Sequence, residues 1–192
     1  MYRFLLILLS VVGMATATGA QQRQDMSKGK SNNKILVAYF SATGTTARAA
    51  EKLADVTNGE LYAIVPARSY TSADLDWNNK QSRSSVEMND PKSRPAIKSK
   101  KENIADYDVI FIGYPIWWGI AAWPVDGFVT GNDFTGKTVI PFCTSASSPL
   151  GQSGELLAKL AGTGDWQEGH RFGSSAAQSE VAAWAEGLGI SG

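Results

Sequence analysis

Three continuous apolar runs constrain the fold of this 192-residue chain more than any other feature of its sequence. They cover residues 35–40, 109–114 and 138–144. A strand that is apolar at every position is buried on both faces, which is typical of a parallel sheet covered by helices on its two sides. Weaker strand candidates at residues 60–65 and 169–172 complete a predicted set of five.

Segments with helical spacing alternate with these strands. They are residues 45–56, 150–161 and 176–188. Five strands interleaved with helices predict an α/β fold: a doubly wound, five-stranded parallel sheet in a three-layer α/β/α arrangement. Pro141 lies inside the third apolar run and has no N–H group, so we expect a bulge or a locally unpaired edge there.

The N-terminal residues 1–20 have the pattern of a secretory signal peptide, with one basic residue, an apolar run over 4–15 and small residues after it. The apolar core of about 12 residues would span only roughly 18 Å as a helix, short of the ~30 Å hydrocarbon layer. We therefore expect an exported protein, periplasmic or, if the segment is not cleaved, membrane-associated and facing the periplasm. The polar residues 21–33 predict a flexible linker before a domain over residues 34–192.

Charge and rare residues exclude several classes of function. Removal of residues 1–20 takes away Arg3 alone and leaves a formal charge of −1, which argues against a nucleic-acid partner. The single cysteine, Cys143, excludes an internal disulfide. The single histidine, His170, has no carboxylate or cysteine partner at suggestive spacing, so a Ser-His-Asp hydrolase is excluded and no metal-ligand constellation is visible.

A hydroxyl-rich loop, Ser41-Ala-Thr-Gly-Thr-Thr46, joins the first apolar run to the first predicted helix. A helix N-terminus has unpaired backbone N–H groups and a partial positive charge, and hydroxyl groups add donors around the same point. The loop lacks the lysine of a triphosphate-binding loop and the glycine pattern of a dinucleotide site. It therefore predicts a monophosphate site, although Ser and Thr also favour this position simply as helix caps.

Two further loops leave the carboxyl ends of predicted strands, where ligands bind in a doubly wound sheet. The second loop reads Pro115-Ile-Trp-Trp-Gly119, and its indole faces offer a flat surface for stacking a planar ligand. Because adjacent loop residues rarely point the same way, we expect one of Trp117 and Trp118 to stack and the other to pack. The third loop, residues 144–151, offers hydroxyl and backbone groups to the polar edge of such a ring.

A phosphate cradle, a stacking loop and a polar edge loop together match a phosphorylated planar heterocycle. On these motifs the chain resembles the flavodoxin family from about residue 34 to residue 188, most specifically in the stretches 41–46 and 113–119. The resemblance implies a flavodoxin-like fold and non-covalently bound flavin mononucleotide (FMN). The residues that it implies for holding the phosphate are Ser41, Thr43, Gly44, Thr45 and Thr46.

The same resemblance assigns the ring of the cofactor to the other two loops. In the second loop, which begins at Pro115, Trp118 would stack on the isoalloxazine, Trp117 would flank its exposed edge, and Gly119 would lie near flavin N5. The residues implied at the pyrimidine edge are Thr144, Ser145 and Ser147.

The function implied is electron transfer outside the cytoplasm, with a redox partner protein or a small quinone-like acceptor and no nucleic acid. An FMN-dependent NAD(P)H:quinone-type reductase is the alternative, and a flavin-free binding module is a second one. Residues 66–107 form a long polar connection in which 72–89 is a weak helix candidate. The sequence assigns this connection no role.

Overall fold

The computed structural model describes residues 33–98 and 100–190, so the predicted signal peptide and all but the last residue of the predicted linker lie outside the described residues. The strands are β1 (Ile35–Tyr39), β2 (Glu60–Ala63), β3 (Val109–Trp117), β4 (Ile120–Ala121), β5 (Thr138–Thr144), β6 (Asp165–Trp166) and β7 (His170–Phe172). The helices are α1 (Thr45–Thr57), α2 (Arg83–Asn89), α3 (Pro124–Thr130), α4 (Ser153–Ala161) and α5 (Gln178–Gly187), with short 3-10 turns at Pro91–Ser93 and Ile104–Asp106. Within the described part of the chain, no helix is both long enough and apolar enough to span a bilayer.

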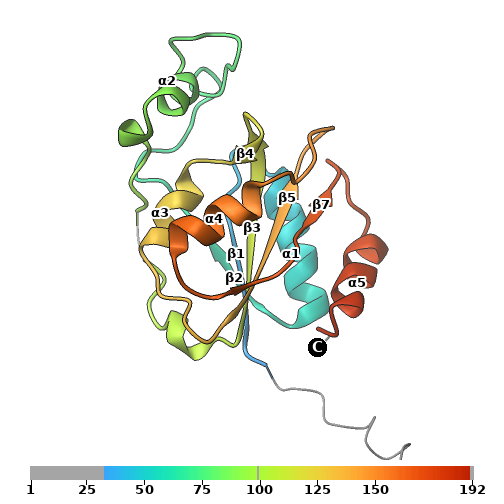
Figure 1. The fold of residues 1–192 in the computed structure, drawn as a ribbon. Helices are drawn as coiled ribbons and strands as arrows, with labels where there is room; N and C mark the ends of the chain where they lie inside the picture. The colour runs from blue at the N-terminus through green and yellow to red at the C-terminus, as the bar shows by residue number, and fades with distance from the viewer. Residues whose placement is uncertain (1–32, 99, 191–192) are drawn as a thin grey trace, which may run out of the picture. The chain divides into compact units, whose positions relative to one another are not determined.

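The predicted doubly wound α/β fold is confirmed. The main strands are parallel and lie in the order β2-β1-β3-β5-β6, with β7 taking over from β6 beside β5. Figure 1 shows α1 and α5 on one face of the sheet and α3 and α4 on the other, which gives three layers. The winding reverses between β1 and β3, so the loops after these two strands meet at the same edge of the sheet.

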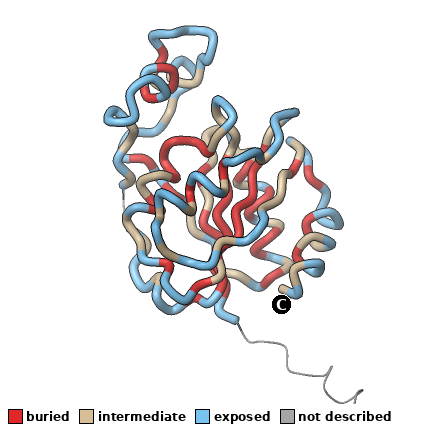
Figure 2. The backbone as a smooth tube through the Cα atoms, viewed as in Figure 1, coloured by how far each residue is buried: buried red, intermediate tan, exposed pale blue. Residues whose placement is uncertain are grey.

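Two hydrophobic clusters, one on each face, explain the continuous apolar runs. Along β1, Leu36 and Ala38 belong to the cluster under α3 and α4, while Ile35 and Val37 belong to the cluster under α1 and α5. Every residue of this strand therefore has an apolar neighbour, and burying a side chain of this kind contributes about 1.5–3 kcal/mol. The buried residues accordingly gather in the central strands (Figure 2).

Pro141 lies where the edge of the sheet is locally unpaired, as predicted. It pairs with Ile112 on the β3 side, but on its other side the pairing stops after Val139–Trp166 and resumes at Phe142–His170. The outer segment uses four residue steps over this interval where β5 uses three, so one extra residue bulges out. The missing N–H of Pro141 therefore interrupts no backbone hydrogen bonding between strands.

Two helix predictions need correction, and one helix was not predicted. The weak candidate at 72–89 is helical only in α2, because the preceding polar residues form turns stabilised by side chains such as Asp74, which accepts from the Thr71 amide and hydroxyl. The helix predicted at 150–161 begins at Ser153, in α4. We did not predict α3, whose seven residues start with Pro124 and contain Gly127, so its sequence carries little helical signal.

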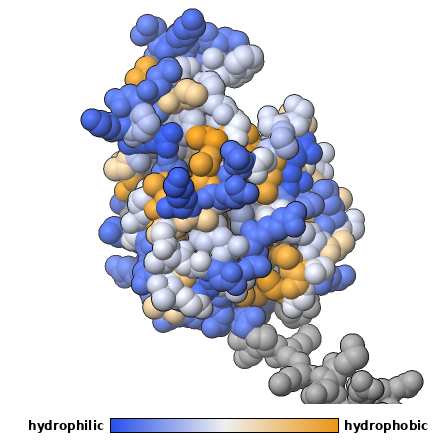
Figure 3. Space-filling model, in the orientation of Figure 1, coloured by the Kyte–Doolittle hydropathy of each residue, from blue (hydrophilic) through white to orange (hydrophobic). Residues whose placement is uncertain are grey.

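Residues 66–98 form an excursion, called the arm, that leaves β2 and returns beside it. Its base is closed by an antiparallel bridge between Pro66 and Ile97 and by backbone bonds from Ala67 to Ala96 and from Lys98 to Val65. The arm contains α2 and projects beyond the carboxyl edge of the sheet (Figure 1), and its outer surface is mostly hydrophilic (Figure 3). This polar segment therefore stands over the edge where the predicted site lies.

Candidate functional site

The loop between β1 and α1 has the backbone of an anion cradle. Gly44 adopts a left-handed conformation, with φ of +87°, and its N–H donates to Ser41 Oγ at 3.0 Å. The first backbone bond of the helix runs from Arg48 N to Gly44 O. The N–H groups of Thr45, Thr46 and Ala47 have no acceptor among the residues that the structure describes, as expected for the first turn of a helix.

The hydroxyl groups of this loop are not equivalent. Thr43 is exposed, whereas Thr46 is buried and its Oγ1 lies 2.7 Å from Oγ1 of Thr144, at the end of β5. Thr45 Oγ1 accepts from Arg48 Nη2 at 3.3 Å. The guanidinium of Arg48 therefore lies at the mouth of the cradle, where it would attract a phosphate. Our sequence analysis missed Arg48, although a cation on the first helical turn after such a loop is a usable signal.

The tryptophan loop is the turn of a hairpin. Trp117 pairs with Ile120, so Trp118 and Gly119 are the two central residues of the connection between β3 and β4. Both have positive φ, 46° and 82°, which is the type I′ conformation that matches the twist of hairpin strands. Asn and Gly normally fill these positions, and a bulky residue at the first is strained.

The two tryptophans point differently, as predicted. Trp117 makes edge contacts with Phe40, Tyr70 and Trp123 at ring-centroid distances of 5.6, 5.1 and 5.7 Å. Trp118 stacks on Trp123, with centroids 5.8 Å apart and planes at 25°, and is 41% exposed. Trp117 is therefore the packing residue, and Trp118 retains exposed surface at the tip of the hairpin.

The side chain of Arg171, in β7, fixes the third loop by hydrogen bonds. Our sequence analysis did not predict this role of Arg171. Its Nε donates to Ser145 Oγ at 2.8 Å and to Ser148 O at 3.0 Å, and its Nη2 donates to the carbonyls of Ser145 and Ala146 at 3.0 and 2.9 Å. Four bonds to one guanidinium fix this loop. Ser147 is exposed beside them.

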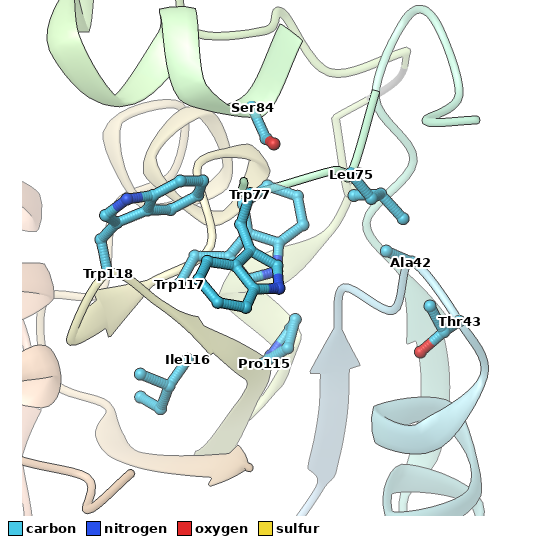
Figure 4. A pocket seen from close by; sticks show the side chains of 9 residues that line it. All are labelled: Ala42, Thr43, Leu75, Trp77, Ser84, Pro115, Ile116, Trp117 and Trp118. Carbon is cyan, nitrogen blue, oxygen red and sulfur yellow. The ribbon is translucent and has the colours of Figure 1, made fainter. Parts of the chain in front are cut away.

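The carboxyl edge carries a cavity of about 410 Å³. Figure 4 shows its lining: Ala42, Thr43, Leu75, Trp77, Ser84, Pro115, Ile116, Trp117 and Trp118. The cavity thus brings together the predicted residues Thr43, Pro115, Trp117 and Trp118 with three residues of the arm. No residue of the third loop lines it, but Gly151 approaches the carbonyl oxygen of Gly119, which would lie 3.9 Å from a Cβ placed on Gly151.

A buried polar network fixes the arm to this edge. The hydroxyl of Tyr70 donates to Glu87 at 2.5 Å, and Arg83 pairs with the same carboxylate at 2.7 Å while its guanidinium lies 4.1 Å from the Tyr70 ring centroid. Burial, together with the bond to Glu87, raises the pKa of Tyr70 well above its usual value, so the phenol stays protonated. Because Tyr70 also contacts Trp117, the network connects the arm to the hairpin.

Cys143, near the third loop, is a core residue. It is fully buried in β5, and burial raises the pKa of its thiol to about 12. The thiol therefore stays protonated at neutral pH, and we assign it no chemical role.

The comparisons with known proteins agree with this architecture. The flavodoxin family model matches residues 34–188. The crystal structure of a candidate flavoprotein from Bacteroides eggerthii DSM 20697 is similar at 58% sequence identity, covering 83% of this chain and 99% of that chain with a TM-score of 0.77. The chain belongs to the flavodoxin family. The strand order found above is also the flavodoxin order.

Two further structures extend the comparison. A candidate flavoprotein from Bacteroides uniformis ATCC 8492 is 49% identical, with 80% of this chain and 98% of that chain covered and a TM-score of 0.76. A flavoprotein from Lactobacillus acidophilus NCFM, crystallised in complex with FMN, is 24% identical, with 80% and 99% covered and a TM-score of 0.61, which shows the shared fold. No curated protein matches the chain.

The residues of this flavodoxin-family chain suit FMN as a ligand. The cradle offers three free N–H groups, the exposed hydroxyl of Thr43 and the guanidinium of Arg48, a donor set that fits a phosphate dianion. The hairpin offers the exposed part of the Trp118 indole, which fits a flat aromatic ring. The role of every predicted residue toward the cofactor, including Ser41, Thr45, Gly119, Thr144, Ser145 and Ser147, stays a prediction.

Proposed function

We propose that this flavodoxin-family protein binds one FMN at the carboxyl edge of its sheet and transfers electrons outside the cytoplasm. The observation that carries the proposal is that Thr43, in the loop before α1, and the exposed indole of Trp118, at the tip of the β3–β4 hairpin, line the same cavity. A redox protein or a small quinone-like molecule is the partner. The signal-like residues 1–20 support export, since they combine a basic start, an apolar core and small residues.

Each part of the site has a separate task. The N–H groups of Thr45, Thr46 and Ala47 and the hydroxyl of Thr43 bind the phosphate, and Arg48 compensates its charge. Trp118 orients the ring by stacking, while the third loop, fixed by Arg171, presents its backbone to the polar edge. When bound, FMN supplies one- and two-electron chemistry, and the protein tunes its potential through stacking and hydrogen bonding.

FMN titration of the purified protein tests the proposal directly. We expect saturable binding of one FMN per chain, with quenching of flavin fluorescence by the stacked indole and reversible reduction of the bound flavin. A protein that fails to bind added FMN would refute the proposal. Rapid bleaching by NADH or NADPH, followed by turnover of a quinone, would assign the protein to the FMN-dependent reductases instead.

The phosphate cradle has its own test, because Thr43 is exposed and can be replaced without disturbing the core. Thr43→Asp places a negative charge where the phosphate should bind, so FMN affinity should fall below detection while the thermal unfolding temperature stays unchanged. Ala183→Asp adds the same charge on an exposed position of α5 and serves as the matched control. Unchanged FMN affinity in Thr43→Asp would disprove the assignment of the phosphate to this loop.

A further inference from the structure

The hydroxyl of Ser84 is a buried polar group without a partner at the roof of the cavity. Ser84 is 1% exposed, and its Oγ has no hydrogen-bond partner among the described residues. Its main chain is fixed, because its N–H donates to the carbonyl of Asp74 and its carbonyl accepts from Trp123 Nε1. A hydroxyl held in this way and left unpaired is uncommon in native proteins.

The walls around this hydroxyl are aliphatic and aromatic and carry no charge. Leu75 and Trp77 come from the arm, and residues 115–118 come from β3 and the hairpin (Figure 4). Trp77 is 71% exposed although its indole lines the cavity, so a large aromatic surface is open to a ligand. The nine lining residues include no charged side chain, and Thr43 and Ser84 alone among them carry a hydroxyl group. A charged ligand would find no counter-charge in this lining.

The cavity lies on the arm side of the hairpin, away from the third loop. Its lining includes no residue of 144–151, whereas the hairpin tip meets that loop where Gly119 approaches Gly151. In the proposed function the cofactor ring stacks on Trp118 and presents its polar edge to the third loop. Thr43 and Trp118, which the proposed function assigns to the cofactor, lie at opposite ends of the lining (Figure 4). The assignment leaves the space between them, under Ser84 and Trp77, to another molecule, and the hairpin is a wall of both sites.

We propose that the cavity under the arm is a second ligand site for a small, neutral, planar aromatic molecule with a carbonyl oxygen on its edge. Trp77 and Trp117 hold the ring, and the Ser84 hydroxyl donates to the carbonyl oxygen. A volume of about 410 Å³ suits a compound of two fused rings. The inference rests on the proposed function only for the place of the cofactor ring, since the cavity itself is formed without FMN.

Equilibrium dialysis with 2-methyl-1,4-naphthoquinone, in the absence of reductant, tests this site in the FMN-saturated and the FMN-free protein. The matching probe without oxygen is 2-methylnaphthalene. We expect the wild type to prefer the quinone about 3- to 10-fold, the factor of one neutral hydrogen bond. Ser84→Ala should abolish that preference and leave FMN affinity unchanged. Ser72→Ala, an exposed arm serine that does not line the cavity, should change neither.

Trp77→Ala separates the aromatic wall from the hydroxyl. It should weaken both probes alike by about tenfold, the order of one lost stacking contact, and leave FMN affinity unchanged. The inference is overturned if the wild type binds neither probe, if FMN displaces the quinone competitively, or if Ser84→Ala weakens FMN and not the quinone. Failure of the wild type to bind FMN would refute the proposed function, and dialysis of the FMN-free protein would still decide the second site.

Discussion

Trp118 offers a prediction in which stability and cofactor binding change independently. The residue has φ of 46° at the first central position of a type I′ turn, and this left-handed conformation costs a side chain other than Gly or Asn about 1–2 kcal/mol. It recovers part of that cost by stacking on Trp123, which contributes roughly 0.5–1.5 kcal/mol beyond simple burial. Two substitutions separate these contributions, because Asn tolerates the turn conformation and Ala does not.

Trp118→Ala removes the stacking contact and keeps the backbone strain, so we expect the free energy of unfolding to fall by about 1–2 kcal/mol. Trp118→Asn removes the same contact and relieves about 1 kcal/mol of strain, so its loss should be between zero and about 1 kcal/mol. Urea denaturation of the FMN-free proteins measures both values. Asn58 is already in the left-handed conformation at the end of α1, so Asn58→Ala calibrates the cost of that strain in this protein.

The two variants should lose FMN affinity equally, by about tenfold, because each removes the indole. Equal unfolding free energies for Trp118→Ala and Trp118→Asn, together with a measurable cost for Asn58→Ala, would refute the argument from backbone strain. Unchanged FMN affinity in both variants would move the stacking role from Trp118 to Trp117 or elsewhere.

Two other predictions follow from side chains behind the site. Arg171→Met removes four hydrogen bonds that fix the third loop. Exchange of the Ser145 amide, whose N–H donates to the carbonyl of Phe172, should therefore accelerate at least tenfold, while the unfolding free energy falls by only about 1–2 kcal/mol because water can replace the protein donor. Arg68→Met, which removes an exposed arginine paired with Asp74 at 3.4 Å, should leave both unchanged. Burial against Trp184 lowers the pKa of His170 in the folded protein. As the pH falls through about 6.5, the imidazole therefore takes up a proton in the unfolded chain before it does so in the folded protein, and the free energy of unfolding should decline. In His170→Gln the midpoint of urea denaturation should depend less on pH between 7.5 and 5.5. The same decline in this variant as in the wild type would contradict the assignment of the pH dependence to His170.

The three central strands β1, β3 and β5 could be predicted because burial on both faces makes almost every residue apolar, whereas the two-residue strands β4 and β6 were not predicted. Ile35 and Leu36 belong to opposite clusters, so no polar residue interrupts the run. The helix α3 could not be predicted from the sequence, because a seven-residue helix that contains Gly127 depends on packing rather than on helix propensity. Tertiary contacts such as those of Phe128 and Val129 with the core stabilise it, and a single sequence does not reveal such contacts.

The loops of the candidate site could be predicted from the sequence, but the side-chain contacts that join them could not. Residues 41–46 and 115–119 are recognisable because they follow apolar strands directly. The bond between Thr46 and Thr144 joins residues 98 positions apart, and the contacts of Arg171 with residues 145–148 depend on the bulge beside β5. The contribution of the arm to the site could not be predicted for a different reason. Its composition is that of a surface loop, and only the fold brings Trp77 and Ser84 over the edge of the sheet.

Three unfavourable features of this fold lie at one edge. The free N–H groups of α1, the strained backbone of Trp118 and the unpaired hydroxyl of Ser84 all lie around the carboxyl ends of β1 and β3. At the opposite end of β3 two charged side chains are paired: Lys137 donates to two backbone carbonyls, and Glu60 accepts from Tyr107 and Lys101. Strain and unpaired donors that occur together at this rim mark it as a place where ligands, rather than the chain itself, complete the interactions.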